Sequence, residues 1–161
     1  MDKLVLIFVL LIFSACGYKY PNQDNAKNEL LAYTQKYSNT DESFLMIASY
    51  LNPVLEEEFL VQENVILAIY PKSTKIDLNS FSINEEPADA FLVDENDEFV
   101  KLAPIEVPWG KYIKIRTKPQ DTPNLELKFN RLLREARGIS RPHRESLILK
   151  RNAKSLYWNA K

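Results

Sequence analysis

The sequence predicts a mainly β protein whose strands form an antiparallel β-sandwich. Two densely apolar runs, each followed closely by a proline, have the length of buried strands. Two later runs alternate apolar and polar side chains, which is typical of strands with one face in the core and the other in water. Turn residues separate about seven such segments, and many short strands at this spacing favour a sandwich.

The two densely apolar strands lie in the first half of the chain. Residues 44–51 are apolar on both faces, which predicts a strand with neighbours on both sides. Residues 65–70 are equally apolar and end at Pro71, which cannot donate to a strand ladder. Before them, residues 28–42 fit either a short helix or a first strand, and the periodicity does not decide between the two.

Shorter strands are expected at residues 76–83, 90–93 and 99–102, with acidic turns between them. Residues 112–117 alternate, so their odd-numbered side chains should face the core and their even-numbered ones water, and residues 125–129 repeat the pattern. Tyr112 begins the first of these alternating strands. Its hydroxyl could tie a neighbouring loop, as in a tyrosine corner, or it could be an exposed strand tyrosine.

The N-terminus has the features of a secretory signal peptide. Asp2 and Lys3 precede ten consecutive apolar residues, 4–13, and the small residues Ser14 and Ala15 follow. A helix that crosses a bilayer needs about 20 apolar residues, so this run is too short to span one. We therefore expect residues 1–15 to be removed.

The only cysteine of the chain, Cys16, follows this run. Phe13-Ser14-Ala15-Cys16 resembles the lipobox of bacterial lipoproteins, although Phe13 stands where leucine is usual. The resemblance implies cleavage between Ala15 and Cys16 and covalent lipid on the Cys16 thiol. Two or three acyl chains hold a domain firmly on a bilayer. Gly17, where a retention signal would have aspartate, implies the outer membrane, with the domain facing the periplasm.

Three further segments, residues 43–53, 59–71 and 108–115, resemble small immunoglobulin-like lipoproteins of the Campylobacter and Helicobacter group. The similarity covers residues 16–130 and implies an immunoglobulin-like sandwich. It supplies no catalytic or ligand-binding residues. A competing resemblance rests on residues 16–19, Cys-Gly-Tyr-Lys, which match the mature start of some lipopolysaccharide-assembly lipoproteins.

These observations divide the chain into four parts: a signal peptide (1–15), a lipidated tether (16–28), a β-sandwich domain (29–130) and a basic C-terminal extension (131–161). In the extension, residues 131–137 fit a short helix that ends at Gly138. The remainder fits either a second helix or a hairpin.

Charge is distributed very unevenly. Residues 41–106 hold 15 acidic and 3 basic side chains, whereas residues 107–161 hold 14 basic and 4 acidic ones. The basic residues of the extension are candidates for binding an envelope protein, an anionic lipid or lipopolysaccharide; nucleic acid is not an expected partner in the periplasm. These candidates are Arg131, Arg134, Arg137, Arg141, Arg144, Lys150, Arg151 and Trp158. Alternatively, the extension neutralises the acidic part of its own domain.

Residues that could support catalysis are sparse. His143 is the single histidine, Cys16 is assigned to the lipid, and three glycines are too few for a phosphate-binding loop. The sequence therefore predicts no catalytic residues, no metal site and no cofactor other than the lipid. We expect a non-enzymatic, lipid-anchored binding or accessory subunit. The alternative is a lipopolysaccharide-assembly or lipid-handling lipoprotein that uses the basic extension.

Overall fold

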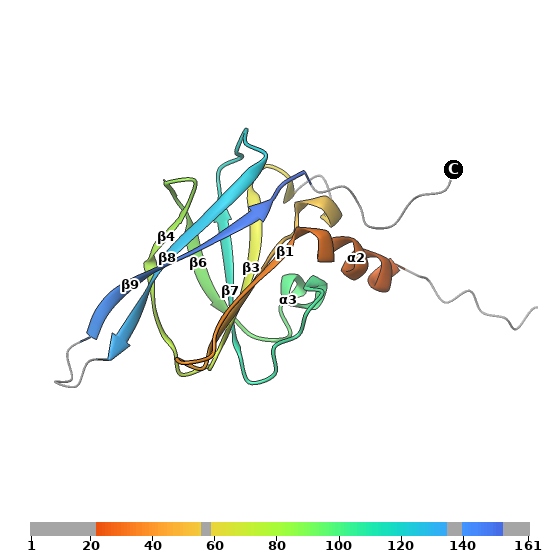
Figure 1. The fold of residues 1–161 in the computed structure, drawn as a ribbon. Coiled ribbons are helices and arrows are strands. Elements are labelled where there is room, and N and C mark those ends of the chain that lie inside the picture. The colour runs from red at the N-terminus through yellow and green to blue at the C-terminus, as the bar shows by residue number, and fades with distance from the viewer. Residues whose placement is uncertain (1–21, 56–58, 135–139, 153–161) are drawn as a thin grey trace, which may run out of the picture.

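The computed structural model describes residues 22–55, 59–134 and 140–152. Within them the chain forms two antiparallel sheets packed face to face (Figure 1). The predicted β-sandwich is confirmed. Helices α2 (Asn22–Leu30) and α3 (Glu98–Leu102) cover the outer side of one sheet, and two short 3-10 helices, η1 (Leu31–Tyr33) and η2 (Asn52–Val54), flank its strands.

The larger sheet has five strands in the order β1-β2-β3-β7-β6. Their bounds are Thr34–Asn39 (β1), Phe44–Tyr50 (β2), Glu63–Tyr70 (β3), Lys111–Thr117 (β7) and Asp89–Val93 (β6). The two densely apolar runs form β2 and β3, and each has a neighbour on both sides, as was predicted for residues 44–51. Both of their faces are buried, which explains why apolar residues do not alternate with polar ones there.

The smaller sheet has the order β5-β4-β8-β9. Its strands are Glu86–Pro87 (β5), Lys75–Ile83 (β4), Asn124–Arg134 (β8) and Ser140–Lys150 (β9). Strands β8 and β9 pair along their whole length, with Leu125 opposite Leu149 and Leu127 opposite Leu147. All four of these leucines are buried between the sheets.

The strand order is that of the immunoglobulin fold. Strands β2, β3, β7 and β6 take the places of A, B, E and D, while β4, β8 and β9 take those of C, F and G. Strand β5 extends the second sheet beside β4, and β1 adds one strand beyond the first. A cluster of apolar side chains from both sheets fills the interior, including Phe81 stacked on Phe129 with ring centroids 4.9 Å apart.

A second apolar cluster lies on the outer face of the five-stranded sheet. Leu30 of α2 and Phe99 of α3 pack there against Ile66 and Tyr112. The outer face of β7, expected to be wet, is therefore covered at Tyr112, which is 8% exposed. Lys114 stays at the margin, where its ammonium lies 4.2 Å from the centre of the Phe99 ring.

Two expectations for residues that precede the C-terminal extension are wrong. Residues 99–102 form α3 and not a strand, because the Asp97 side chain caps the helix by accepting a hydrogen bond from the Phe99 backbone N–H at 2.9 Å. Residues 22–28, expected as tether, belong to α2, whose last residue Leu30 is fully buried. The helix and the strand that were alternatives for residues 28–42 both occur, as the end of α2 and as β1.

The helix expected at residues 131–137 is wrong where the structure describes it, since residues 131–134 end β8. The expected domain boundary at residue 130 falls inside that strand, and residues 140–150 form its neighbour β9. The alternation of β8 continues inward through Arg131, a charged residue whose carboxylate partner, Glu145 of β9, is buried with it. A charge on the core face concealed the strand pattern.

Candidate functional site

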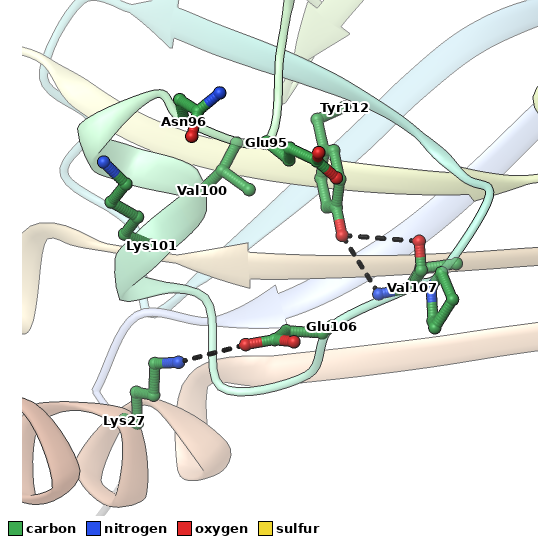
Figure 2. A pocket seen from close by; sticks show the side chains of 9 residues that line it. Lys27, Glu95, Asn96, Val100, Lys101, Glu106, Val107 and Tyr112 are labelled. Atoms are coloured by element: carbon green, nitrogen blue, oxygen red, sulfur yellow. Dashed lines mark hydrogen bonds and ion pairs between the residues drawn. The ribbon is translucent and has the colours of Figure 1, made fainter.

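The connection from α3 to β7, residues 103–110, separates two depressions on the same side of the molecule. The first is a polar cleft of about 510 Å³ between α2, α3 and this loop (Figure 2). It is lined by Lys27, Glu95, Asn96, Val100, Lys101, Glu106, Val107, Pro108 and Tyr112. Its ammonium and carboxylate groups can contact charges of either sign on a partner.

The hydroxyl of Tyr112 anchors this loop to β7. It accepts a hydrogen bond from the Val107 backbone N–H at 3.0 Å and lies 3.4 Å from the Val107 carbonyl oxygen, to which it can donate (Figure 2). Of the two alternatives for Tyr112, the structure has the tie between its hydroxyl and a loop and not the exposed strand tyrosine. Tyr112 lies on strand E of the fold, whereas the tyrosine corner of immunoglobulin domains lies on strand F.

The same residue, Val107, begins a tight turn that ends at Gly110 and is closed by a hydrogen bond from the Gly110 N–H to the Val107 carbonyl at 3.0 Å. Pro108 occupies the second position and Trp109, with φ 58°, the third. A proline followed by a residue with positive φ defines a type II turn, whose third position normally holds glycine or asparagine. A tryptophan in this left-handed backbone conformation destabilises the fold by about 1–2 kcal/mol.

The side chain of Trp109 is 83% exposed, so packing within the domain does not compensate for the backbone strain. Gly110 is required beside it, because a Cβ atom there would lie 2.9 Å from the Val107 carbonyl oxygen and 3.1 Å from that of Ile69. The turn therefore directs a large aromatic side chain outward into solvent. Such strain persists where the surrounding structure enforces it and is frequent at functional sites.

The second depression, an apolar groove of about 360 Å³, lies beside Trp109 on the outer face of the five-stranded sheet. Leu45 and Ile47 of β2 form its floor, and Tyr70, which is 40% exposed, lines it from β3. Lys36 of β1 is the only basic residue among the lining residues. An exposed aromatic side chain next to an apolar groove is the arrangement found at hot spots of protein interfaces.

The candidate basic residues are dispersed. Arg131 is 5% exposed, donates from Nε to Glu145 at 2.7 Å, pairs with Glu42, and lies 4.1 Å from the centre of the Phe44 ring. Burial lowers the pKa of Arg131, but the hydrogen bonds to the two carboxylates outweigh this effect and raise the pKa above its ordinary value. The guanidinium is therefore part of the fold, inaccessible to a partner.

Arg144 and Arg151 are also engaged by their own domain. Arg144 donates to the Ser80 carbonyl and the Ser82 hydroxyl, both at 3.0 Å, and Arg151 pairs with Glu63 at 3.3 Å. Arg141 and Lys150 lie exposed on β9. The side chain of Arg134 and the residues Arg137, Trp158, Ala15 and Cys16 lie outside the part of the chain that the structure describes.

Ion pairs connect the acidic and basic parts of the chain. Four described pairs join them: Lys114–Asp97, Lys128–Glu85, Arg131–Glu42 and Arg151–Glu63. Lys128 and Arg131 of β8, and Arg151 directly after β9, thus neutralise acidic residues of their own domain. This was the alternative to partner binding by the basic segment.

A buried polar cluster is centred on Glu63, which is 1% exposed. Its carboxylate accepts hydrogen bonds from the Tyr50 hydroxyl and the Gln120 backbone N–H, both at 2.7 Å, besides pairing with Arg151. Burial raises the pKa of Tyr50 above its ordinary value of 10.0, and the bond to Glu63 raises it further. The cluster therefore joins β2 and β3 to Arg151, directly after β9, and to the loop after β7.

Among residues 22–55, 59–134 and 140–152, no three or more histidine, cysteine, aspartate and glutamate side chains are grouped so that they could hold a metal ion. None of the helices within these ranges has the length and apolar composition needed to cross a membrane. Comparison with family models, with curated proteins and with solved structures found no match to this chain. The geometry of the loop is therefore the main guide to function.

Trp109 is a candidate functional residue that the sequence analysis did not single out. The signal was present in Pro108-Trp109-Gly110, because a proline two residues before a glycine is typical of a tight turn. A tryptophan between them must lie at the turn's outer corner, where burial is difficult.

Proposed function

We propose that the protein is a lipid-anchored, immunoglobulin-like binding module of the bacterial envelope, held at the outer membrane and facing the periplasm. It acts as an accessory subunit that recruits a partner protein, without catalysis and without a cofactor beyond the lipid on Cys16. The contact surface is the Trp109 turn together with the apolar groove beside it.

The observation that carries this proposal is the conformation and exposure of Trp109. The turn would form at lower cost with glycine or asparagine, and the 83% exposed side chain gains little from its own domain. A partner that buries the indole would supply the missing stabilisation. Tryptophan is among the residues most enriched at interface hot spots, where burial of one side chain is worth at least about 2 kcal/mol.

The position of the anchor supports a partner close to the membrane. Only residues 17–21 separate Cys16 from the first residue of α2, and six extended residues span at most about 20 Å. Helix α2 is in turn linked to the binding loop by the ion pair between Lys27 and Glu106 at 3.5 Å. A lipid on Cys16 therefore keeps this end of the domain near the bilayer surface.

The lipopolysaccharide-handling alternative has less support. It depends on free cationic side chains in residues 131–161, and three of them, Arg131, Arg144 and Arg151, already bond to the domain itself. We retain it only as an outcome of the binding experiment below.

Two variants test the proposal in cells. Cys16→Ser, in a chain from which residues 1–15 have been removed, should move the protein from the membrane fraction to the soluble fraction, because no thiol is left to carry the lipid. Trp109→Asn should reduce in-cell crosslinking to the partner by at least about tenfold, the factor that corresponds to 1.4 kcal/mol. Val61→Asn is the matched control, since it also removes an exposed apolar side chain, 69% exposed, away from the groove.

Unchanged capture by Trp109→Asn would refute the assignment of this surface. Capture of lipopolysaccharide in place of a protein, independent of Trp109, would favour the alternative function. Membrane retention of a Cys16→Ser chain from which residues 1–15 have been removed would refute the lipid anchor and leave the binding surface to be judged by the Trp109→Asn comparison.

A further inference from the structure

The groove beside Trp109 combines an apolar floor with hydrogen-bond donors. No described residue forms a hydrogen bond with the Trp109 indole N–H or the Tyr70 hydroxyl, and none forms an ion pair with Lys36. The indole and the ammonium can only donate hydrogen bonds. Glu106, the single carboxylate among the lining residues, pairs with Lys27 at 3.5 Å. A segment that matches this groove therefore carries acceptors, a negative charge and apolar surface.

The register of the sheet separates the aromatic side chains of the groove from its basic one. Tyr70 lies opposite Leu45 and Lys36 lies opposite Ile47, so all four side chains share the outer face of the sheet. Trp109 comes two residues before β7, which pairs with β3 and β6, and so it lies on the β3 side of the groove. Strand β2 runs between Tyr70 and Lys36, and at the usual strand spacing these two residues are about 10–12 Å apart.

The common modes of peptide recognition differ in what they offer to such a groove. Its floor is the face of a sheet, where β2 already pairs with β1 and β3, so a partner segment cannot be added there as a strand. An α-helix uses its carbonyls for its own hydrogen bonds, which leaves the indole and hydroxyl donors without a backbone acceptor. A polyproline II helix has no internal hydrogen bonds, so its carbonyls are free, and its proline rings are apolar. Aromatic-lined grooves bind such segments in several kinds of domain.

We infer that the groove binds a proline-rich segment of the partner protein in the polyproline II conformation, with an aspartate or glutamate of that segment paired to Lys36. Proline rings would pack against Trp109 and Tyr70, whose N–H and hydroxyl would donate to carbonyls of the segment. Because a polyproline II helix rises about 3.1 Å per residue, the acidic residue would lie three or four positions from the proline at Tyr70. The inference rests on the function proposed above, since it specifies what the same surface recognises.

The experiment is a calorimetric titration of the full lipidated chain in detergent with a peptide of four Pro-Pro-Glu repeats. A polyproline II helix has three residues per turn, so the glutamates of this peptide lie along one edge. We expect saturable binding that Trp109→Asn weakens about tenfold or more. Lys36→Glu should reverse the charge preference and bind a peptide of Pro-Pro-Lys repeats more tightly. Lys75→Glu is the matched control, because Lys75 is exposed on β4, outside the groove, and the change in net charge is the same.

Four results would overturn the inference. They are absence of binding by the wild type, equal binding of a peptide of Ala-Ala-Glu repeats, an unchanged preference for Pro-Pro-Glu in Lys36→Glu, and self-association of the chain that Trp109→Asn abolishes. The last result would identify a second copy as the occupant.

The failure of this inference can be told apart from failure of the proposed function. If the titration fails while in-cell crosslinking to an envelope protein still depends on Trp109, the binding surface stands and only the proline-rich segment is refuted. If the titration and the Trp109-dependent crosslinking both fail, the proposed function is refuted as well. Equal unfolding midpoints of the wild type, Lys36→Glu and Lys75→Glu verify that the fold is intact.

Discussion

Replacing Glu63 with alanine should remove about 4 kcal/mol from the free energy of unfolding. The substitution leaves the Tyr50 hydroxyl and the Gln120 N–H without their acceptor, and each hydrogen bond to a charged group contributes about 1.5–3 kcal/mol. The ion pair with Arg151 adds less, about 1 kcal/mol at most, because the arginine side chain is 30% exposed. Breaking a buried pair by removing one partner typically costs about 3–5 kcal/mol.

The assay is urea unfolding of the purified chain, followed by far-ultraviolet circular dichroism. Glu106→Ala is the matched control, since Glu106 also pairs with a cation, Lys27, but is 78% exposed and should lose less than about 0.5 kcal/mol. Glu63→Ala could instead lose less than about 1 kcal/mol of unfolding free energy, or both variants could lose the same amount. Either result would show that burial does not make the Glu63 cluster important for stability.

Three other variants test the turn at residues 107–110 and the polar cluster around Glu63. Gly110→Ala should destabilise the fold by about 1–3 kcal/mol, because its Cβ meets two carbonyl oxygens, and an unaltered urea midpoint would contradict this. Trp109→Asn should instead stabilise it by up to about 1 kcal/mol, since asparagine accepts positive φ more readily; a clear loss of stability would show that the indole supports the fold. The free energy of unfolding of the wild type should fall by up to about 1.4 kcal/mol per pH unit as the pH rises above about 10, because Tyr50 ionises in the unfolded state before it does in the folded state. Tyr50→Phe should reduce this slope of stability against pH. An identical slope in the variant would disprove the raised pKa of Tyr50.

Strands with uniform local patterns could be predicted from the sequence. In β2 and β3 both faces are buried, so nearly every residue is apolar, and in β8 the inward leucines alternate with polar residues. These signals are local, and they sufficed for the sandwich. The order of the strands is not a local signal. The structure supplies it, and it is the order of the immunoglobulin fold.

The errors arose where a distant contact decides the local structure. Residues 131–134 read as a charged helix because the sequence does not reveal that Arg131 is buried against Glu145, fourteen positions away, and over the Phe44 ring. Helix α3 is only five residues long, and its apolar residues fit a strand equally well until the Asp97 cap and the packing of Phe99 are known. The same holds for the predicted arginines, since contacts with distant residues show that Arg131, Arg144 and Arg151 bond within their own domain.

The most direct test of the proposed binding surface is photo-crosslinking from position 109 in cells. A photoreactive phenylalanine derivative replaces Trp109 in the full lipoprotein, and a second version carries it in place of Val61, which is 69% exposed away from the groove. The account predicts that irradiation joins one envelope protein to position 109 and not to position 61. Equal products from both positions, or a product from position 61 alone, would contradict it.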